Sequence, residues 1–294
     1  MLHASVMPVS RAKRESLRAL AGLVAAMLCC AWPGAGHAEN RPRVASINTC
    51  TDQLVLTLAD PEQIVGLSPY SRDPHRSWAA EAASRFPRLS GEAEDVLVLK
   101  PDVVVAGRFT KRETRELLKE KGLHVAEFDV ARSLDDAKQQ MLQMGELLGH
   151  PDRAAAENAR LDVAIARTRA AASRVSYRVL ALSRRGWVSG DDDLMSSLLT
   201  ATGLTNAAGN FGRRVGGFVT LEQIVANRPD LLLVSSDSEF AEDQGRAFLL
   251  HPAIEALYPP DKRLVLPEQL TVCGGPMLAE ALDRLTAEIS RVNR

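Results

Sequence analysis

The chain has 294 residues, with 36 lysines and arginines against 37 aspartates and glutamates, so its formal net charge at pH 7 is −1. This balance argues against a nucleic-acid partner, which would call for clustered positive charge. After residue 38 no segment approaches the roughly 18 apolar residues of a membrane-spanning helix, so stable membrane insertion is not expected.

The first 38 residues have the features of a secretory signal peptide. A basic segment at 11–18 precedes an apolar stretch, Leu20–Ala31, and Gly-His-Ala at 36–38 forms a small-x-small cleavage site. The apolar stretch is too short to span a membrane as a helix. We expect cleavage after Ala38 and a periplasmic location, with an uncleaved anchor or a lipid-bearing N-terminus as the alternatives.

Between residues 39 and 131, short apolar strands alternate with helices. Thr51 or Asp52 can cap the first helix, and Gly122 is placed to end a later one. Four consecutive apolar residues at 103–106 are typical of a parallel strand buried on both faces. The alternation predicts an α/β sheet covered by helices. In chain order, the expected strands are 43–47, 64–67, 103–106 and 123–128, and the expected helices carry residues 54–58, 92–100 and about 111–121.

The segment 132–174 changes character and predicts a helical linker. Ser133 can cap a helix that runs to about Leu148, and Pro151 is placed as the first residue of another helix. Nine alanines lie between residues 154 and 172. Because alanine has the highest helix propensity, residues 152–173 are expected to form one helix of roughly 33 Å. This helix is either an ordinary surface helix or a stiff connection between two lobes.

From residue 175 to 294 the α/β pattern restarts. The expected elements are strand 178–182, helix 193–202, helix 220–227, strand 231–235, strand 263–266 and helix 276–291. Two stretches, "EDVLVLKPDVVVAG" and "EQIVANRPDLLLVSS", repeat one motif at an offset of 128 residues, pairing Glu94 with Glu222 and Asp102 with Asp230. The repeat predicts two similar lobes, 39–131 and 175–294, joined by the helical linker.

Four stretches together resemble the periplasmic binding proteins of ABC importers for vitamin B12 and ferric siderophores. They are "RVASINTCTDQLVLTLADPEQIVGLSPYSRDP", "EDVLVLKPDVVVAGR", the 152–173 helix and "LEQIVANRPDLLLV". The resemblance implies two Rossmann-like lobes joined by one long helix, as in class III binding proteins. It also implies a non-enzymatic, monomeric protein that captures an iron–siderophore, cobalamin or haem and delivers it to a permease. No resident cofactor is expected beyond the bound cargo.

In this family, one glutamate on each lobe docks onto arginines of the membrane permease. Glu94 and Glu222 match those positions, each seven residues before the proline of the repeated motif. Ion pairs at such an interface mainly fix register and speed encounter. The alternative is that each glutamate merely occupies the first turn of a helix, where the macrodipole favours a negative charge.

Ligands of open α/β sheets bind beyond the carboxyl ends of the strands, so the loops there are candidates for the cargo site. Aromatic rings on these loops could stack on a planar or macrocyclic ligand. Arginines there suit an anionic chelate, since the guanidinium group grips carboxylates with two hydrogen bonds. The candidate ligand-binding residues are Cys50, Thr51, Tyr70, Arg108, Arg184, Arg185, Trp187, Arg213, Arg214 and Cys273; Arg72, Phe211 and Phe218 lie on the same loops.

The resemblance to vitamin B12 binders is incomplete at two positions. Those proteins place tryptophans over the corrin, whereas Gly107 and Leu270 stand where two of them would align; Tyr70 is retained. The departure favours an anionic iron complex over cobalamin. Haem is also an option, because its propionates would suit the arginines.

Cys50 and Cys273 are the two cysteines that remain after cleavage. A disulfide between them would hold the cleft shut, so we expect separate, inert thiols first, a disulfide second and thiol ligation of cargo third. A secreted hydrolase is the alternative function. The sequence lacks a Gly-x-Ser-x-Gly elbow and a phosphate-binding glycine loop, and its histidines have no metal-ligand spacing, so no protein metal site is expected.

Overall fold

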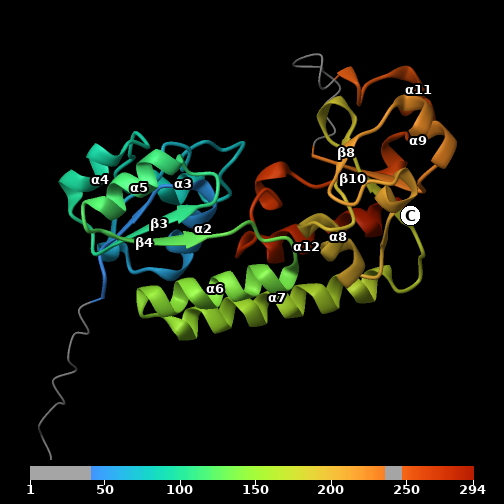
Figure 1. The fold of residues 1–294 in the computed structure, drawn as a ribbon. Helices are drawn as coiled ribbons and strands as arrows, with labels where there is room; N and C mark the ends of the chain where they lie inside the picture. Colours follow the sequence, from blue (N-terminus) through green and yellow to red (C-terminus); the bar gives the residue numbers. More distant parts are fainter. Residues whose placement is uncertain (1–40, 236–246) are drawn as a thin grey trace, which may run out of the picture. The chain divides into compact units, whose positions relative to one another are not determined.

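The computed structural model describes residues 41–235 and 247–294, and the part of the chain from Arg41 onward forms one compact unit (Figure 1). The expected signal peptide, residues 1–38, and its cleavage site lie outside the described residues. Two four-stranded parallel sheets with covering helices confirm the expected α/β class.

The first sheet has the strand order β2-β1-β3-β4. Along β3, Val103 and Val105 face one hydrophobic cluster while Val104 and Ala106 face another, so the strand is buried on both sides as its apolar run predicted. The strands are β1 (Val44–Ser46), β2 (Ile64–Gly66), β3 (Val103–Gly107) and β4 (His124–Phe128). The helices are α2 (Thr49–Leu58), the 3-10 turn η1 (Pro61–Gln63), α3 (Ala80–Ala83), α4 (Ala93–Leu99) and α5 (Arg112–Glu120).

The second sheet has the strand order β10-β9-β5-β7 and carries a separate antiparallel pair, β6 with β8. The pair β6–β8 and the short strand β7 were not predicted. The strands are β5 (Arg178–Ala181), β6 (Trp187–Val188), β7 (Thr205–Asn206), β8 (Gly217–Phe218), β9 (Leu231–Val234) and β10 (Arg263–Val265). The helices are α8 (Leu194–Ala201), α9 (Leu221–Asn227) and α11 (Pro252–Leu257), and the 3-10 turns are η2 (Arg184–Gly186), η3 (Ala207–Phe211), η4 (Pro260–Lys262) and η5 (Glu268–Leu270).

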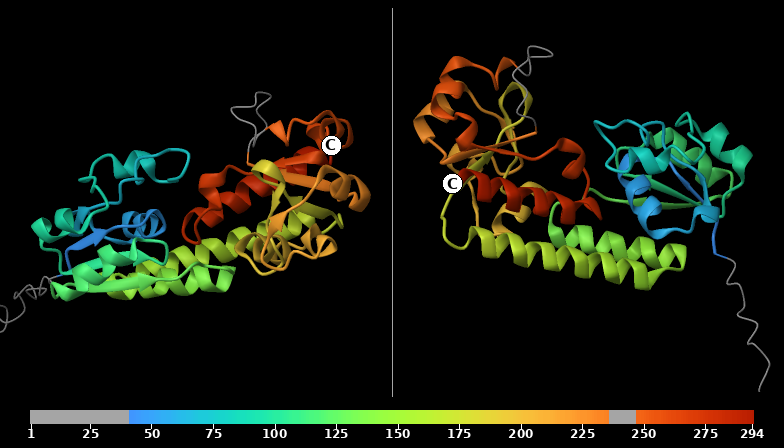
Figure 2. Two further views of the ribbon diagram at one scale, coloured as in Figure 1. Left: turned by 45° about the horizontal axis from the view of Figure 1, so that its top comes forward. Right: turned by 180° about the vertical axis from the view of Figure 1, so that it is seen from behind.

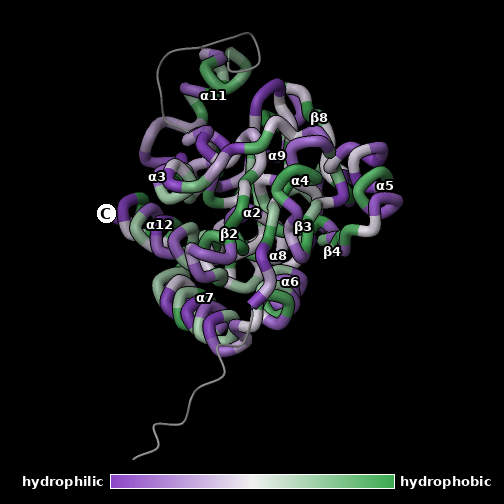
Figure 3. The backbone as a smooth tube through the Cα atoms, turned by 90° about the vertical axis from the view of Figure 1, so that its left-hand side faces the viewer, coloured by the Kyte–Doolittle hydropathy of each residue, from purple (hydrophilic) through white to green (hydrophobic). Residues whose placement is uncertain are grey.

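Three helices pack together, and one of them, α6 (Leu134–Leu148), contacts the helix α2 beside the first sheet and the helix α8 beside the second. The other two are α7 (Pro151–Ala172) and α12 (Met277–Val292), and α7 packs along both α6 and α12 (Figure 2). The long helix expected at 152–173 is therefore confirmed. In Figure 3, pale green and purple stretches alternate along α7, which agrees with its narrow buried stripe of small and apolar side chains. This stripe consists of Ala154, Leu161, Ala164, Thr168 and Ala172.

A cluster of charged side chains fixes the beginning of α7 against the first sheet. Asp60, beside η1, accepts hydrogen bonds from Arg153 at 2.6 Å and from Arg41 at 2.5 Å, and His150 lies 3.1 Å away. The hydrogen bond from Arg153 is the main reason that the pKa of Asp60 is lowered from 3.8 to about 2. The Asp60 carboxylate therefore stays charged, and keeps these contacts, at any pH well above about 2.

The repeated motif has the same structural role in both sheets. The Asp102 carboxylate accepts a hydrogen bond from the backbone N–H of Arg43 at 2.7 Å, while the Arg43 guanidinium donates to the Lys100 carbonyl at 2.8 Å. In the second copy, Asp230 accepts from the backbone N–H of Arg178 at 2.8 Å. Each Lys/Arg-Pro-Asp sequence thus ties the end of one helix to the first strand of its sheet.

Lys100→Gly and Arg228→Gly are each expected to raise the free energy of unfolding by up to about 1 kcal/mol. Both residues end a helix with a left-handed φ, 46° and 44°, where a Cβ costs energy that glycine avoids. Urea denaturation followed by circular dichroism measures the change. The matched control is Lys121→Gly, at a helix end with φ of −80°, where glycine should lower stability. A loss at residues 100 and 228 equal to that at 121 would contradict the prediction.

Candidate functional site

A small pocket of about 100 Å³ lies at the carboxyl ends of β1, β3 and β4. Three of the predicted ligand-binding residues, Cys50, Thr51 and Arg108, line it, and Cys273 joins them from the loop before α12. Arg108 pairs with Asp129 at 3.3 Å. The lining also includes residues that were not predicted: Asn48, Phe109, Val130 and Val272.

Two of these unpredicted residues could have been found from their positions after predicted strands. Phe109 follows β3, Val130 follows β4, and both are exposed apolar side chains directly after strand ends; the exposed fraction of Phe109 is 84%. Gly107 is small for a local reason. A Cβ at this position would lie 2.5 Å from Asn48 Cγ, so the Asn48 side chain fills the space that a larger residue would need.

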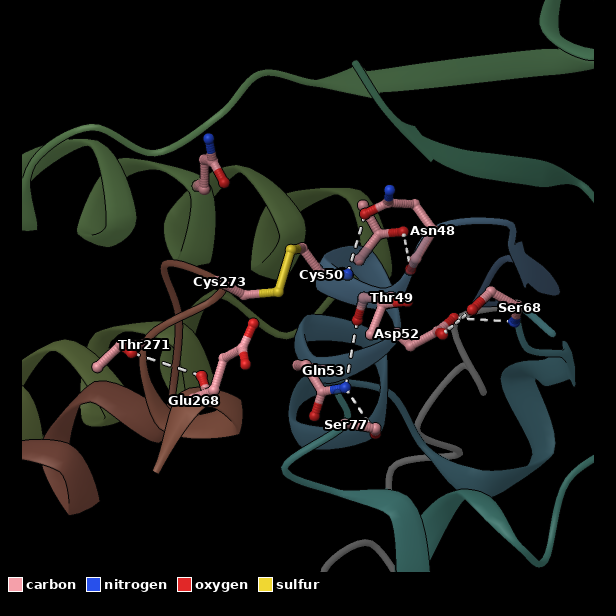
Figure 4. The surroundings of a disulfide bond; sticks show 12 residues. Asn48, Thr49, Cys50, Asp52, Gln53, Ser68, Ser77, Glu268, Thr271 and Cys273 are labelled. Carbon is pink, nitrogen blue, oxygen red and sulfur yellow. Dashed lines mark hydrogen bonds between the residues drawn. A yellow bond between two sulfur atoms is a disulfide. The ribbon is translucent and has the colours of Figure 1, made fainter. Parts of the chain in front are cut away.

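Cys50 and Cys273 form a disulfide bond, with their Cα atoms 5.3 Å apart (Figure 4). Our first expectation, separate thiols, is therefore wrong, and so is thiol ligation of cargo, since neither sulfur is a thiolate. The physical reason is close packing: a Cβ on Gly274 would lie 2.4 Å from the Cβ of Ala131, so the loop that carries Cys273 lies against the segment entering α6. That packing brings residue 273 to the first turn of α2.

Asp52, in the same turn of α2, is a buried carboxylate. Its oxygens accept hydrogen bonds from the Ser68 hydroxyl at 2.5 Å and from the Ser68 N–H at 3.1 Å (Figure 4). Burial raises the pKa of Asp52 from 3.8 to about 7, and hydrogen bonds from Ser46 and Ser68 offset only part of that effect.

Tyr70 lies on the loop after β2 and is 51% exposed. The guanidinium of Arg76 lies over its ring, 5.0 Å from the centroid. The pKa of Lys111, in the loop after β3, is raised mainly by a hydrogen bond to its partner Glu92. Arg72, on the same loop as Tyr70, donates a hydrogen bond to the Phe86 carbonyl at 2.6 Å and so helps to hold the loop after β2 in place.

A larger pocket of about 430 Å³ lies at the carboxyl ends of β5, β9 and β10. Arg184, Arg185 and Trp187 line it, as does Phe218, whose ring meets Trp187 edge to face with centroids 5.2 Å apart. The two rings are cross-strand neighbours in the pair β6–β8. They stay 41% and 57% exposed, respectively, so this pocket offers aromatic surface beside two arginines.

Other residues of the same loops are placed elsewhere. Arg213 and Arg214 do not line the pocket, and Arg214 lies 3.8 Å from Asp192. Phe211 packs against the core of the second sheet. The acidic residues Asp193 and Glu268 do line the pocket, and burial raises the pKa of Asp193.

One segment contributes to both pockets. Glu268 and Thr271 line the larger pocket, while Val272 and Cys273 line the smaller one. The disulfide therefore anchors a loop that borders both. Leu270, in the middle of this loop, is buried in the core.

Glu94 and Glu222 occupy equivalent places on two helices. Each is exposed and is the second residue of its helix, α4 or α9. A hydrogen bond from Thr220 lowers the pKa of Glu222, so that carboxylate is charged at neutral pH. The structure thus presents two carboxylates in matching local settings, one beside each sheet.

The structure describes residues 41–235 and 247–294, and two absences within that range concern metal binding and membrane insertion. Within that range, His, Cys, Asp and Glu side chains form no group of three or more that could hold a metal ion. The helices of the same range include none that is long and apolar enough to cross a membrane.

The family model for periplasmic binding proteins matches residues 44–257 of the chain. The chain belongs to the periplasmic binding protein family. This family was expected from the doubled motif and the long helix, and the match covers both. Among solved structures, the binding protein is similar to the periplasmic heme-binding protein of Roseiflexus sp. RS-1, at 25% identity and a TM-score of 0.69, covering 86% of this chain and 100% of the other.

Two further relatives of the binding protein carry related names. The cobalamin-binding protein of Halobacterium salinarum is 26% identical over 211 residues, which are 66% of this chain. The matched region spans 54% of that relative, or about half its length. The periplasmic vitamin B12 binding protein of Vibrio cholerae, at 16% identity and a TM-score of 0.64 over 86% of this chain and 99% of the other, supports the fold alone.

Proposed function

We propose that this binding protein is the solute-binding component of an ABC importer and that its cargo is a metal chelate with an aromatic or macrocyclic body and anionic groups. An iron–siderophore, haem and cobalamin all meet that description. The observation that carries the proposal is the larger pocket, where the exposed pair Trp187 and Phe218 lies beside Arg184 and Arg185. Ring faces suit a flat ligand, and guanidinium groups suit its carboxylates.

The relatives support the same class of cargo. The Roseiflexus structure is of a heme-binding protein and the Halobacterium relative is a cobalamin-binding protein, so the names agree on metal-bearing macrocycles. Both pockets lie at the carboxyl ends of parallel strands, which is the usual place for a ligand of an α/β sheet. Within this proposal Tyr70, Arg108 and Thr51 belong to the N-terminal side of the site.

In this proposal the protein has two lobes and delivers its cargo to a membrane permease. The lobes are 39–131 and 175–294, joined by the helical linker 132–174, and the protein acts as a monomer after export and cleavage behind Ala38. Glu94 and Glu222 then dock the loaded protein onto the two transmembrane subunits of the permease.

Titration of the purified protein with haem, cyanocobalamin and a panel of ferric siderophores tests the proposed cargo. One of them should quench tryptophan fluorescence saturably, with a Kd in the micromolar range or tighter, because Trp187 lines the larger pocket. Arg185→Ala should weaken that binding by about tenfold, which corresponds to about 1.4 kcal/mol.

Arg174→Ala is the matched control for that titration, since Arg174 is exposed and lines neither pocket. It should leave the Kd unchanged. Calorimetry with the same ligands covers a cargo that binds without quenching. If no member of the panel binds by either method, the proposed cargo class is wrong.

A further inference from the structure

The loop that presents Tyr70 is attached at both ends to two adjacent residues of α2. At its start, the Asp52 carboxylate accepts two hydrogen bonds from Ser68, at 2.5 Å and 3.1 Å. At its end, the Gln53 amide donates to the Ser77 hydroxyl at 2.9 Å and accepts from the backbone N–H of Ala79 at 3.0 Å. Residues 68–79 are therefore held by one ionisable side chain and one neutral side chain (Figure 4).

The same turn of α2 also reaches the smaller pocket. Cys50 forms the disulfide there, and the Thr51 hydroxyl lies 2.8 Å from the Ser46 hydroxyl and donates to the Asn48 carbonyl at 2.9 Å. Pro69 separates Ser68 from Tyr70 and restricts the backbone between them. The position of the Tyr70 ring consequently depends on where Asp52 holds Ser68.

We propose that Asp52 is a positioning residue for cargo binding, which holds the Tyr70 loop in its binding position and makes cargo affinity dependent on pH. The inference rests on the proposed function, because it assigns Tyr70 to the cargo site. Asp52 itself is buried and does not contact the cargo.

The direction of the pH effect follows from burial. Burial raises the pKa of Asp52 to about 7, so a proton favours the arrangement in which the carboxyl group is buried against Ser68. When the carboxyl group is charged, water solvates it better than the protein interior does. The charged form therefore favours release of the loop. The buried arrangement is fully favoured below the ordinary pKa of 3.8 and is progressively disfavoured as the pH rises from there to about 7, so cargo affinity should fall over that range and level off above pH 7.

Charged groups near Asp52 do not account for this titration. In the described part of the chain, the effects that set its pKa are burial and hydrogen bonds from two serines. The charged residues of the loop itself have other partners: Arg72 donates to a backbone carbonyl, Asp73 accepts from the His75 N–H, and Arg76 lies over Tyr70.

Asp52→Asn and Asp52→Ala test the inference in opposite ways. Asparagine retains an acceptor for the Ser68 N–H and a donor for its hydroxyl, so it should bind cargo as the parent does near pH 4 and lose the fall in affinity between about pH 4 and pH 7. Alanine removes both contacts and should weaken binding about tenfold at each pH. Combined with Tyr70→Ala, it should cause no further loss, because both changes act through Tyr70.

Gln53→Ala is the matched control, since it releases the other end of the loop without removing an ionisable group. It should weaken binding and leave the pH dependence in place. A parent-like pH profile in Asp52→Asn would overturn the inference. So would full additivity of Asp52→Ala with Tyr70→Ala.

A second readout separates this inference from the proposed function. In Trp187→Phe protein without cargo, the fluorescence of Trp78, at the end of the loop, should change between about pH 4 and pH 7, and Asp52→Asn should abolish that change. If no cargo binds the parent but this transition is present, the proposed function fails and the attachment by Asp52 stands. If cargo binds but neither the transition nor the affinity depends on Asp52, the positioning inference alone fails.

Discussion

Replacing both Cys50 and Cys273 with serine is expected to lower the free energy of unfolding by roughly 3 to 5 kcal/mol. The disulfide closes a loop with a sequence separation of 223 residues, so it removes a large part of the conformational entropy of the unfolded chain. It also anchors the loop that borders both pockets. Guanidinium denaturation of the purified double variant, followed by circular dichroism, measures the loss.

The parent protein treated with a phosphine reductant is the control for the serine substitutions. Reduction breaks the same covalent bond without changing side-chain volume, so it should reproduce most of the loss. The untreated parent should unfold at a clearly higher denaturant concentration. If the double variant and the reduced parent unfold at the same concentration as the oxidised parent, the disulfide does not constrain the unfolded chain in the way proposed.

The features that the sequence predicted well carry local signals. Pro151 and the alanines that follow it specify α7 without reference to any distant residue, and the four apolar residues at 103–106 specify a buried parallel strand. The repeated motif is also local in origin. Its proline and aspartate end a helix and begin a strand, and the structure adds the partners, Arg43 and Arg178, that no spacing rule would have chosen.

The features that were missed depend on packing between distant segments. Both cysteines were placed on strand-end loops, yet nothing near either residue reports that the two loops meet beside α6. The pair β6–β8 has only two residues in each strand, too few for periodicity to reveal it. These two features nevertheless organise the pockets, one through the disulfide and the other through Trp187 and Phe218.

The arginines of the second sheet show that the direction of a single side chain also could not be predicted from the sequence. All four arginines predicted on the loops of the second sheet lie close to strand ends in sequence. Arg184 and Arg185 line the larger pocket, whereas Arg213 and Arg214 do not. A loop sequence does not specify the direction in which a side chain leaves the backbone, and that direction depends on the turn, here η2, where Arg185 has a left-handed φ of 60°.

Glu94→Arg combined with Glu222→Arg is expected to abolish cargo uptake by cells while leaving cargo affinity unchanged. Each substitution replaces an exposed carboxylate, the second residue of its helix, with a charge that would repel the arginines of a permease. Uptake of labelled cargo by cells that express only the variant measures delivery. Fluorescence titration of the purified variant measures capture, so the two steps are separated.

Glu113→Arg combined with Glu255→Arg is the matched control for that experiment. These glutamates are also exposed and lie in the first turns of α5 and α11, so the control makes the same change in net charge and loses the same favourable helix-dipole interaction. Normal uptake in the control with none in the test variant would assign docking to Glu94 and Glu222. Equal uptake in both variants would mean that the repeated glutamates serve only their helices, since the dipole effect is common to all four positions.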